Sequence, residues 1–333
     1  MSRRIVAVIC GGDSGEHDVS LRSAKGIYGY FDRSRYEPHI LELCGRDWSV
    51  ILPDGSKNAV DKNDFSFVVE GKRVHPDFAF IIIHGRPGEN GMLQGYLDMM
   101  GVPYSTSGVL TESLTFNKFY LNQFLRAWGV SVAESVLLRR NSIDQVTDKD
   151  IISKLGLPCF VKPDADGSSL GVSKVKSEDE LRHAIMKAFK SGNEVIVETF
   201  LDGTEVTCGC YKTRKVARTL PVTEVVPAVE FFNYDAKYNG AVKEITPARI
   251  TADLTRRIQT LTSAIYDILG CEGIIRVDYI LTGAKGKPKE KINLLEVNTV
   301  PGMTETSFIP QQLRAAGLQL GDVLTEIIEN KFA

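Results

Sequence analysis

The chain has 333 residues, more than a single small core usually organises, so we expect two or three domains. Its hydrophobic content of 43% and charged content of 25% are ordinary for a globular protein. The net charge is −2 and the lysines and arginines are spread along the chain, which disfavours nucleic acid as a partner. No apolar run reaches the ~18 residues of a membrane-spanning helix, so we expect no membrane partner.

The cysteines and the first residues indicate a cytoplasmic protein. The six cysteines are scattered, mostly inside apolar segments, and Cys208 and Cys210 form a CxC pattern rather than a CxxC pattern. No histidine pair lies at zinc-binding spacing, so reduced, buried thiols are favoured over disulfides or a metal cluster. The apolar stretch that follows Arg4 is only six residues long, too short for a secretion signal.

The N-terminal third has the pattern of an α/β unit. Residues 4–10 predict a buried strand, residues 11–18 a glycine-rich loop, and residues 19–31 an amphipathic helix. No GxGxxG fingerprint of a dinucleotide site is present. Further strands are predicted at residues 39–44, 65–70 and 78–84. His84 ends the last of these strands, at the edge where open α/β sheets bind ligands, although a structural histidine is an equally open interpretation.

The middle of the chain has the pattern of a phosphate site. A helix is predicted over residues 114–130, with Lys118 in its first turns. A buried strand over residues 159–161 ends at Lys162, and residues 166–171 form a loop of small residues. The backbone N–H groups and hydroxyls of such a loop, with an ammonium nearby, suit phosphate oxygens. A plain hairpin tip is the alternative, and the GxxxxGK[ST] spacing of a Walker A loop is absent.

The following segments alternate between regular and irregular patterns. Residues 194–201 predict a strand that runs into a hinge. Residues 229–250 have little periodicity and predict a long loop of interest rather than a connector. Residues 251–270 predict an amphipathic helix, and residues 310–331 predict closing helices.

Two apolar segments near the C-terminus predict a pair of strands joined by a loop rich in glycine and lysine. If the strands pair, Asp278, Glu296 and Asn298 converge as three hard oxygen ligands, with Arg276 beside them. Such ligands suit a magnesium ion that carries a nucleotide. A solvated hairpin surface is the alternative. The turn at Gly302, which presents backbone N–H groups, favours the functional interpretation.

The order of these motifs resembles the D-alanine–D-alanine ligases of the ATP-grasp superfamily. The segments that carry the resemblance are GGDSGEHDVS (11–20), HGRPGENGMLQGYLDMMGVPYSTSG (84–108), VKPDADGSSLGVSKV (161–175), YDAKY (234–238), IIRVDYIL (274–281) and LLEVNTVPGMTETSFIP (294–310). Each alone is weak evidence, but together and in this order they are specific.

The resemblance implies an α/β protein, α+β in its ATP-binding part, with the three-domain ATP-grasp fold. Residues 1–107 would form an N-terminal Rossmann-like domain with a parallel sheet, on the side of the first D-alanine. Residues 108–198 would form a central ATP-grasp subdomain with a phosphate lid. Residues 199–333 would form a C-terminal ATP-grasp subdomain with the metal site and a substrate loop. The resemblance also implies a homodimer.

The implied reaction joins two D-alanine molecules to D-alanyl-D-alanine through an acyl phosphate, releasing ADP and phosphate, for peptidoglycan precursor synthesis. It uses ATP and two Mg²⁺ or Mn²⁺ ions. Tyr238 stands where related ligases that make D-alanyl-D-lactate carry a histidine, so D-alanine rather than D-lactate is expected as acceptor. The alternative is another ATP-grasp carboxylate–amine ligase with a different amino acid, which would not be expected to share Glu16, YDAKY or Ser307.

The resemblance also assigns roles to the matching positions. The phosphate contacts are Lys118, Lys162, Ser169 and Lys237, and the adenine and ribose contacts are Glu198, Phe200, Leu201 and Glu205. The metal ligands are Asp278, Glu296 and Asn298, and the oxyanion donors are Arg276 and the backbone N–H of Gly302. The substrate contacts are Glu16, His84 and Ser307, with Lys237 again at the second carboxylate, and Ser168, Glu16 and Tyr238 form the set that holds the substrate loop closed.

This sequence departs from the family pattern at a few positions. Arg86 and Pro87 stand where many members have a further glycine, and Asn90 stands where an aspartate is common. Phe308 stands where a leucine is frequent, which is expected to narrow the acceptor pocket. None of these departures removes a predicted metal ligand or phosphate contact, so an active enzyme is expected.

Overall fold

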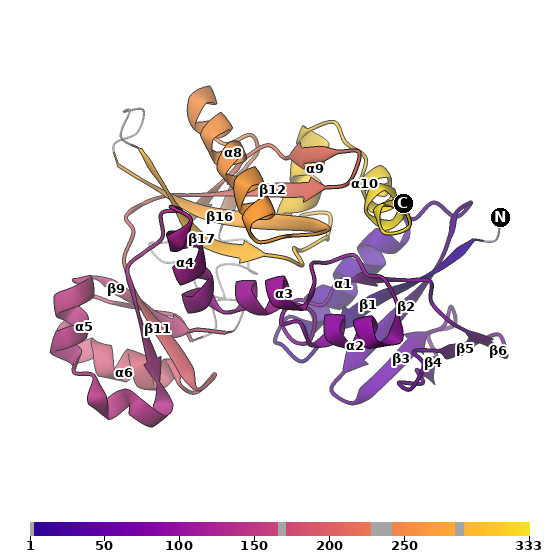
Figure 1. The fold of residues 1–333 in the computed structure, drawn as a ribbon, viewed down its shortest axis with the longest axis horizontal. Coiled ribbons are helices and arrows are strands. Elements are labelled where there is room, and N and C mark those ends of the chain that lie inside the picture. Colours follow the sequence, from indigo (N-terminus) through magenta and orange to yellow (C-terminus); the bar gives the residue numbers. More distant parts are fainter. Residues whose placement is uncertain (1–2, 166–170, 228–241, 284–289) are drawn as a thin grey trace.

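The structure, a computed structural model, describes residues 3–165, 171–227, 242–283 and 290–333 (Figure 1). Three larger sheets follow one another along the chain, and the C-terminal helix α10 (Leu320–Asn330) returns to the first of them. Among the helices in these ranges, none is both long and apolar enough to cross a membrane.

The first sheet has the strand order β4-β3-β2-β1-β7. Its strands are β1 (Arg4–Gly11), β2 (Tyr36–Cys44), β3 (Asp47–Ile51), β4 (Lys57–Ala59) and β7 (Phe78–Ile81). β2, β1 and β7 run parallel, as predicted, whereas β3 and β4 add antiparallel strands at one edge, so the sheet is mixed rather than purely parallel. A separate hairpin pairs β5 (Phe67–Val69) with β6 (Lys72–Val74). β4 and β6 escaped prediction because these short segments are largely exposed and carry little hydrophobic pattern. β3, which buries Val50, was not predicted either.

Helices from both ends of the chain cover this sheet. α1 (His17–Tyr28) follows the glycine-rich loop, and α2 (Met92–Met100) follows β7. Ile27 of α1 and Ile327 of α10 belong to one buried cluster with Val6 and Val8 of β1. The last helix therefore completes the N-terminal core, and Figure 1 shows it beside α1.

The helix predicted over residues 114–130 is two helices, α3 (Val109–Phe116) and α4 (Lys118–Ala127). Asn117 breaks the helix with an extended backbone (ψ 105°), and its side chain accepts a hydrogen bond from the N–H of Tyr120. Asparagine is a favoured N-cap because its side chain satisfies a free N–H of the first turn. Lys118 is thus the first residue of a new helix.

The second sheet is antiparallel, with the order β10-β9-β11-β8. Its strands are β8 (Ser135–Arg139), β9 (Cys159–Pro163), β10 (Ser173–Val175) and β11 (Glu194–Thr199). A short 3-10 helix, η1 (Arg140–Gln145), follows β8. α5 (Asp148–Leu155) and α6 (Glu178–Ala188) share a buried cluster with the sheet, so one of its faces is covered.

The third sheet is also antiparallel, and β12 pairs with β13, β14 and β16. Its strands are β12 (Gly203–Lys212), β13 (Ala217–Thr219), β14 (Thr223–Pro227), β15 (Val242–Ile245), β16 (Ile274–Thr282) and β17 (Lys291–Asn298). The helices α8 (Ala252–Ile268) and α9 (Phe308–Ala315) belong to this part. The loop predicted over 229–250 is wrong at residues 242–245, which form β15, and residues 229–241 lie outside the described ranges.

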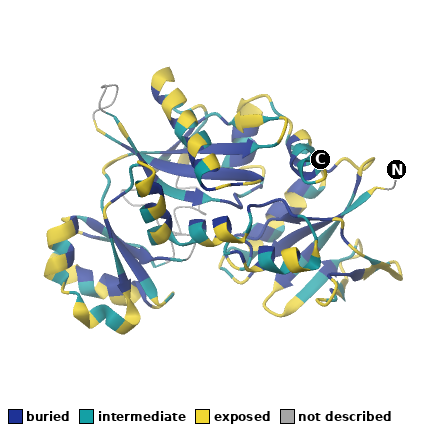
Figure 2. Cartoon of the chain, viewed as in Figure 1, coloured by how far each residue is buried: buried dark blue, intermediate teal, exposed yellow. Residues whose placement is uncertain are grey.

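Buried side chains concentrate along the sheets, and exposed ones along the outer faces of helices such as α5 and α6 (Figure 2). The six cysteines are all free thiols, as predicted, and five are buried while Cys44 is exposed. Burial raises the pKa of the Cys208 thiol to about 12, so this group stays protonated and inert at neutral pH.

Candidate active site

A cavity of about 1130 Å³ is lined by residues of the second and third sheets and, in the N-terminal part, by residues of α1 and of the loop after β7. Its walls contain every predicted site residue that the structure describes. These residues are Glu16, His84, Lys118, Lys162, Glu198, Phe200, Leu201, Glu205, Arg276, Asp278, Glu296, Asn298, Gly302 and Ser307. The other predicted site residues, Ser168, Ser169, Lys237 and Tyr238, lie outside the described ranges.

The strand pair β16–β17 builds the acidic wall of the cavity. The strands pair antiparallel, as predicted, and the register places Asp278 opposite Glu296 and Arg276 opposite Asn298. The register shifts by one residue directly after Asp278, so Leu295 is an extra residue in β17. Opposed residues of an antiparallel pair share one face, so these four polar side chains meet at the cavity.

Arg276 and Asp278 form a buried pair in this wall. The guanidinium donates from Nε to Oδ1 at 2.9 Å and from Nη2 to Oδ2 at 2.8 Å. Thr207 of β12 adds a hydrogen bond from Oγ1 to Oδ1 at 2.5 Å. Burial alone would disfavour the charged guanidinium, but the Asp278 carboxylate outweighs it and raises the pKa of Arg276 above its ordinary value. Arg276 is therefore a permanent cation inside the cavity.

The oxygen-bearing side chains of this wall fit a divalent cation. Asp278 and Glu296 supply carboxylates and Asn298 supplies an amide, all hard oxygen donors of the kind that Mg²⁺ prefers. Within the described ranges no three His, Cys, Asp or Glu side chains form a metal cluster, because the third donor here is an amide. Asn298 Nδ2 lies 3.1 Å from Asp278 Oδ2 and 3.4 Å from Glu296 Oε1, so the amide already bridges the two carboxylates.

Two lysines face the cavity from the central part of the chain. Lys162 Nζ lies 2.5 Å from Glu198 Oε2, and Asn122 Nδ2 donates to Glu198 Oε1 at 3.0 Å. Burial lowers the pKa of Lys118, an effect that Glu296 opposes and Lys162 reinforces. Two neighbouring ammonium groups that repel each other suit a polyanionic ligand, because phosphate oxygens would relieve that repulsion.

Aromatic and aliphatic side chains form another part of the cavity lining. The rings of Phe160 and Phe200 lie with their centroids 5.8 Å apart, and Lys174 Nζ lies 3.9 Å from the centroid of Phe200. Leu201 and Glu205 also line the cavity. Apolar walls with a nearby carboxylate can hold a purine base and the hydroxyls of its ribose.

The N-terminal part contributes two loops to the cavity. Glu16 is the N-cap residue of α1, and its N–H donates to Ser14 Oγ at 3.2 Å. Ser14 in turn donates from Oγ to the carbonyl of His84 at 2.7 Å, which joins the two loops. His84 is buried, and its Nδ1 lies 2.8 Å from the carbonyl oxygen of Val300. His84 therefore ties the N-terminal sheet to the segment after β17.

Glu89 also lines the cavity, although no role was predicted for it from the sequence. Its Oε2 accepts from the N–H of Gly85 at 2.6 Å, and its Oε1 accepts from the N–H of Val300 at 3.3 Å. Burial raises the pKa of Glu89 to about 7, the N–H of Gly85 lowers it in part, and the charge of Glu16 raises it further. The only signal in the sequence was an acid inside the glycine-rich segment that follows His84.

The variant Glu89→Gln is expected to flatten the pH dependence of stability. The pKa of Glu89 is about 7 in the folded chain against an ordinary 4.5, so the folded state holds the proton more tightly than the unfolded state. The contribution of this group is therefore complete below pH 4.5 and is lost as the pH rises through 7, by at most about 1.4 kcal/mol per pH unit. Urea unfolding of both proteins between pH 5 and 8 measures this pH dependence of stability. Parallel curves for the two proteins would contradict the assignment.

The turn after β17 and the start of α9 close the cavity. Ser307 is the N-cap residue of α9, and its Oγ accepts from the N–H of Thr304 at 3.1 Å. A Cβ at Gly302 would lie 2.9 Å from Ser307 Oγ, so only glycine fits this turn without displacing the serine. The ring of Phe308 lies below Arg276, with its centroid 5.2 Å from Cζ.

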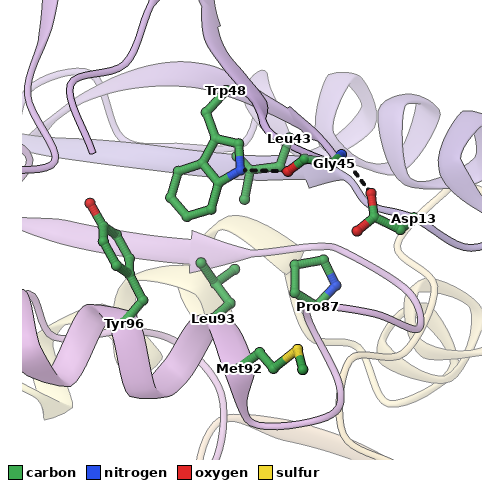
Figure 3. Close-up of a pocket in the computed structure, with 8 residues that line it drawn as sticks. All are labelled: Asp13, Leu43, Gly45, Trp48, Pro87, Met92, Leu93 and Tyr96. Atoms are coloured by element: carbon green, nitrogen blue, oxygen red, sulfur yellow. Dashed lines mark hydrogen bonds between the residues drawn. The ribbon is translucent and has the colours of Figure 1, made fainter. Parts of the chain in front are cut away.

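A second cavity of about 290 Å³ lies between the β2–β3 turn and α2 (Figure 3). Trp48, Leu93 and Tyr96 give it apolar walls, and Asp13 lies at its edge, where Oδ1 accepts from the N–H of Gly45 at 2.6 Å. Among the described residues that line it there is no lysine or arginine. This cavity therefore lacks the cations that a second nucleotide site would need.

Two antiparallel sheets that hold lysines and paired carboxylate-bearing strands around one cavity are the arrangement of the ATP-grasp fold. Solved structures agree. The chain is similar to a D-alanyl-alanine synthetase A from Vibrio cholerae, with a TM-score of 0.86, 28% identity and coverage of 99% of this chain and 98% of that one. It is equally similar to the VanG D-Ala:D-Ser ligase from Enterococcus faecalis, with a TM-score of 0.86, 30% identity and coverage of 98% and 99%.

Family models described as D-ala D-ala ligase N-terminus and D-ala D-ala ligase C-terminus match residues 5–107 and 124–329. A D-alanine–D-alanine ligase from Bacteroides fragilis (strain YCH46) is 60% identical over 330 residues, covering 99% of this chain and all of that protein. One from Parabacteroides distasonis is 54% identical, covering 99% of this chain and 98% of that protein. The chain belongs to the D-alanine–D-alanine ligase family.

Proposed function

We propose that this protein joins two D-alanine molecules to D-alanyl-D-alanine with ATP, releasing ADP and phosphate, as a step of peptidoglycan precursor synthesis. The observation that carries this proposal is the meeting of Lys118, Lys162, Arg276 and the β16–β17 carboxylates in one cavity. Full-length relatives that are named D-alanine–D-alanine ligases support it. ATP as the nucleotide is supported by a similar D-alanine–D-alanine ligase from Bacillus anthracis solved with ATP, with a TM-score of 0.77 and 28% identity.

In the first step a carboxylate oxygen of one D-alanine attacks the γ-phosphorus of ATP, and ADP leaves. Glu16 is in position to bind the ammonium of this D-alanine, which aligns its carboxylate with the phosphates. Lys118 and Lys162 neutralise phosphate oxygens. Lys237 and Ser169 would be further phosphate contacts. Two Mg²⁺ or Mn²⁺ ions, held by Asp278, Glu296 and Asn298, would supply charge neutralisation at the transferring phosphoryl group.

In the second step the amine of the other D-alanine attacks the acyl carbonyl, and phosphate leaves with the former carboxylate oxygen. Arg276 and the N–H of Gly302 would donate to the developing oxyanion. Ser307 and Lys237 would bind the second carboxylate, and Tyr238 with Ser168 and Glu16 would close the site. Alignment of the two substrates can contribute about 7–11 kcal/mol to lowering the barrier.

The acceptor is expected to be D-alanine. With ATP and Mg²⁺, phosphate release should require D-alanine, L-alanine should not replace it, and the product mass should be that of the dipeptide. D-Lactate and D-serine are the informative competitors, since one neighbour is a D-Ala:D-Ser ligase. D-alanyl-D-lactate formed at pH 7 at a rate comparable to the dipeptide would contradict the inference from Tyr238. Turnover only with another amino acid would instead support a different carboxylate–amine ligase of the same fold.

We also propose a cytoplasmic homodimer with domains 1–107, 108–198 and 199–333. Exposed apolar side chains on neighbouring helices support an interface between copies. Met92 and Met99 of α2 and Leu110 of α3 expose 67%, 76% and 80% of their surface. Light scattering should give twice the chain mass of 36.8 kDa, and a monomer at assay concentration would contradict this part of the proposal.

A further inference from the structure

The segment directly after β17 is hydrogen-bonded to helix α3, which is distant in sequence. Thr299 follows Asn298, and its Oγ1 donates to Oε2 of Glu112 at 2.5 Å. Both side chains are buried, with 3% of Thr299 and none of Glu112 exposed. Glu112 lies in α3, far away in sequence, whereas Thr299 lines the cavity within the segment 294–310. One buried hydrogen bond thus links α3 to the end of the carboxylate-bearing strand.

Helix α3 is itself firmly attached to the C-terminal part of the chain. Thr111 donates from Oγ1 to the carbonyl of Leu269 at 2.7 Å, and Ser107 Oγ accepts from the N–H of Glu272 at 3.1 Å. At its other end α3 leads to Lys118, the first residue of α4, whose N–H donates to the carbonyl of Asp164 at 3.2 Å. The bonds at Ser107 and Lys118 hold the two ends of the helix, which gives Glu112 a defined position from which to hold another segment.

Burying the carboxyl group of Glu112 beside Thr299 is energetically unfavourable. Burial raises the pKa of Glu112 well above its ordinary value, and the Thr299 hydroxyl lowers it only in part. A buried polar group is tolerated where its hydrogen bonds are made, and it becomes strongly unfavourable where they are lost. Displacing Thr299 would break the Glu112–Thr299 hydrogen bond and leave a buried carboxyl group without it. The free-energy cost of that displacement is therefore larger than it would be for an apolar contact of the same size.

We propose that Glu112 is a positioning residue: from helix α3 it fixes Thr299, and through Thr299 both Asn298 and the turn that carries Gly302. The inference rests on the proposed ligase function, because Asn298 and Gly302 serve the two chemical steps. Glu112 is not among the described residues that line the cavity. It couples the helix that precedes Lys118 to the strand that carries the metal-site oxygens.

Four variants test this role. Thr299→Val removes the hydroxyl at similar volume, and Thr299→Ser keeps it. Glu112→Ala removes the acceptor, and Glu112→Gln keeps an acceptor oxygen on a neutral side chain. Supporting groups behind metal ligands contribute about 10–100-fold to affinity or activity, so Thr299→Val and Glu112→Ala should lower kcat by about that factor. They should raise the Mg²⁺ concentration for half-maximal rate, while KM for the first D-alanine changes little.

The conservative variants, Thr299→Ser and Glu112→Gln, should restore near-wild-type values. The double variant Thr299→Val/Glu112→Ala should be no worse than either single variant, because both remove the same interaction. The matched control is Thr111→Val, which removes a buried hydrogen bond of the same helix away from β17 while the bonds at Ser107 and Lys118 still hold the two ends of that helix. It should lower the free energy of unfolding and leave kcat and the Mg²⁺ dependence unchanged.

Calorimetric binding of ADP with Mg²⁺ provides a readout without turnover. Thr299→Val and Glu112→Ala should weaken it, and Thr111→Val should not. The inference is overturned if Thr299→Val and Glu112→Ala behave as Thr111→Val does, with lower stability but unchanged kcat, Mg²⁺ dependence and ADP binding. Absence of D-alanine-dependent turnover in the wild type would instead overturn the proposed function, and the calorimetry would still decide the positioning role.

Discussion

Asp278→Asn should abolish most activity, lowering kcat by more than about 100-fold, which is the upper range for supporting groups around metal sites. The variant removes a proposed ligand of the metal ions and also the carboxylate that holds Arg276 through two hydrogen bonds. Because Arg276 is buried, losing its partner charge should also lower the free energy of unfolding by about 3–5 kcal/mol. Steady-state kinetics and urea unfolding measure the two effects on the same protein.

The matched control for Asp278→Asn is Asp267→Asn. Asp267 of α8 also pairs with a cation, Lys212, but 67% of its side chain is exposed. Exposed ion pairs contribute about 0–1 kcal/mol, so this variant should keep both its activity and most of its stability. An unchanged kcat in Asp278→Asn would contradict a role for Asp278 in the reaction.

Lys162→Met should raise KM for ATP by roughly 10–100-fold, because a charge-assisted hydrogen bond contributes about 1.5–3 kcal/mol. It also leaves Glu198, which is 5% exposed, without its ion pair, and among the described side chains Asn122 then remains as its hydrogen-bond donor. An unpaired buried carboxylate should lower the free energy of unfolding by about 3–5 kcal/mol. Saturating ATP should rescue the rate only in part, since Lys162 also faces the transferring phosphate in the proposed mechanism.

Lys154→Met is the control within the same sheet-and-helix unit. Lys154 of α5 is exposed, and its Nζ donates to the carbonyl of Ser135 at 3.2 Å, away from the cavity. This variant should leave KM for ATP unchanged. Equal ATP affinity in Lys162→Met and Lys154→Met would refute a phosphate role for Lys162.

The parts of the site that lie on regular strands were predictable from the sequence. A period of two fixes which side chains of β16 and β17 share a face, and a loop rich in glycine and lysine signals that the strands pair. Asp278 and Glu296 were therefore expected to meet, and they face each other. The one-residue shift after Asp278 was not visible, since nothing in the apolar pattern distinguishes Leu294 from Leu295.

Interactions between distant segments could not be read in this way. Glu112 and Thr299 are separated by most of the chain, and a glutamate in a helical pattern is ordinarily a solvated residue. The break at Asn117 was hidden because the apolar spacing continues across it. The return of α10 to the first sheet depends on packing that no local pattern encodes, since its apolar face would fit any exposed sheet.

The most direct test of the central claim follows an oxygen atom. D-Alanine labelled with ¹⁸O in both carboxylate positions is incubated with the protein, ATP and Mg²⁺, and the released phosphate is analysed by mass. Transfer of the γ-phosphoryl group to the carboxylate, followed by attack of the second amine, predicts one ¹⁸O in every phosphate. The dipeptide should keep the other three labels, one in the peptide carbonyl and two in the terminal carboxylate. Unlabelled phosphate released together with dipeptide would contradict the acyl-phosphate route.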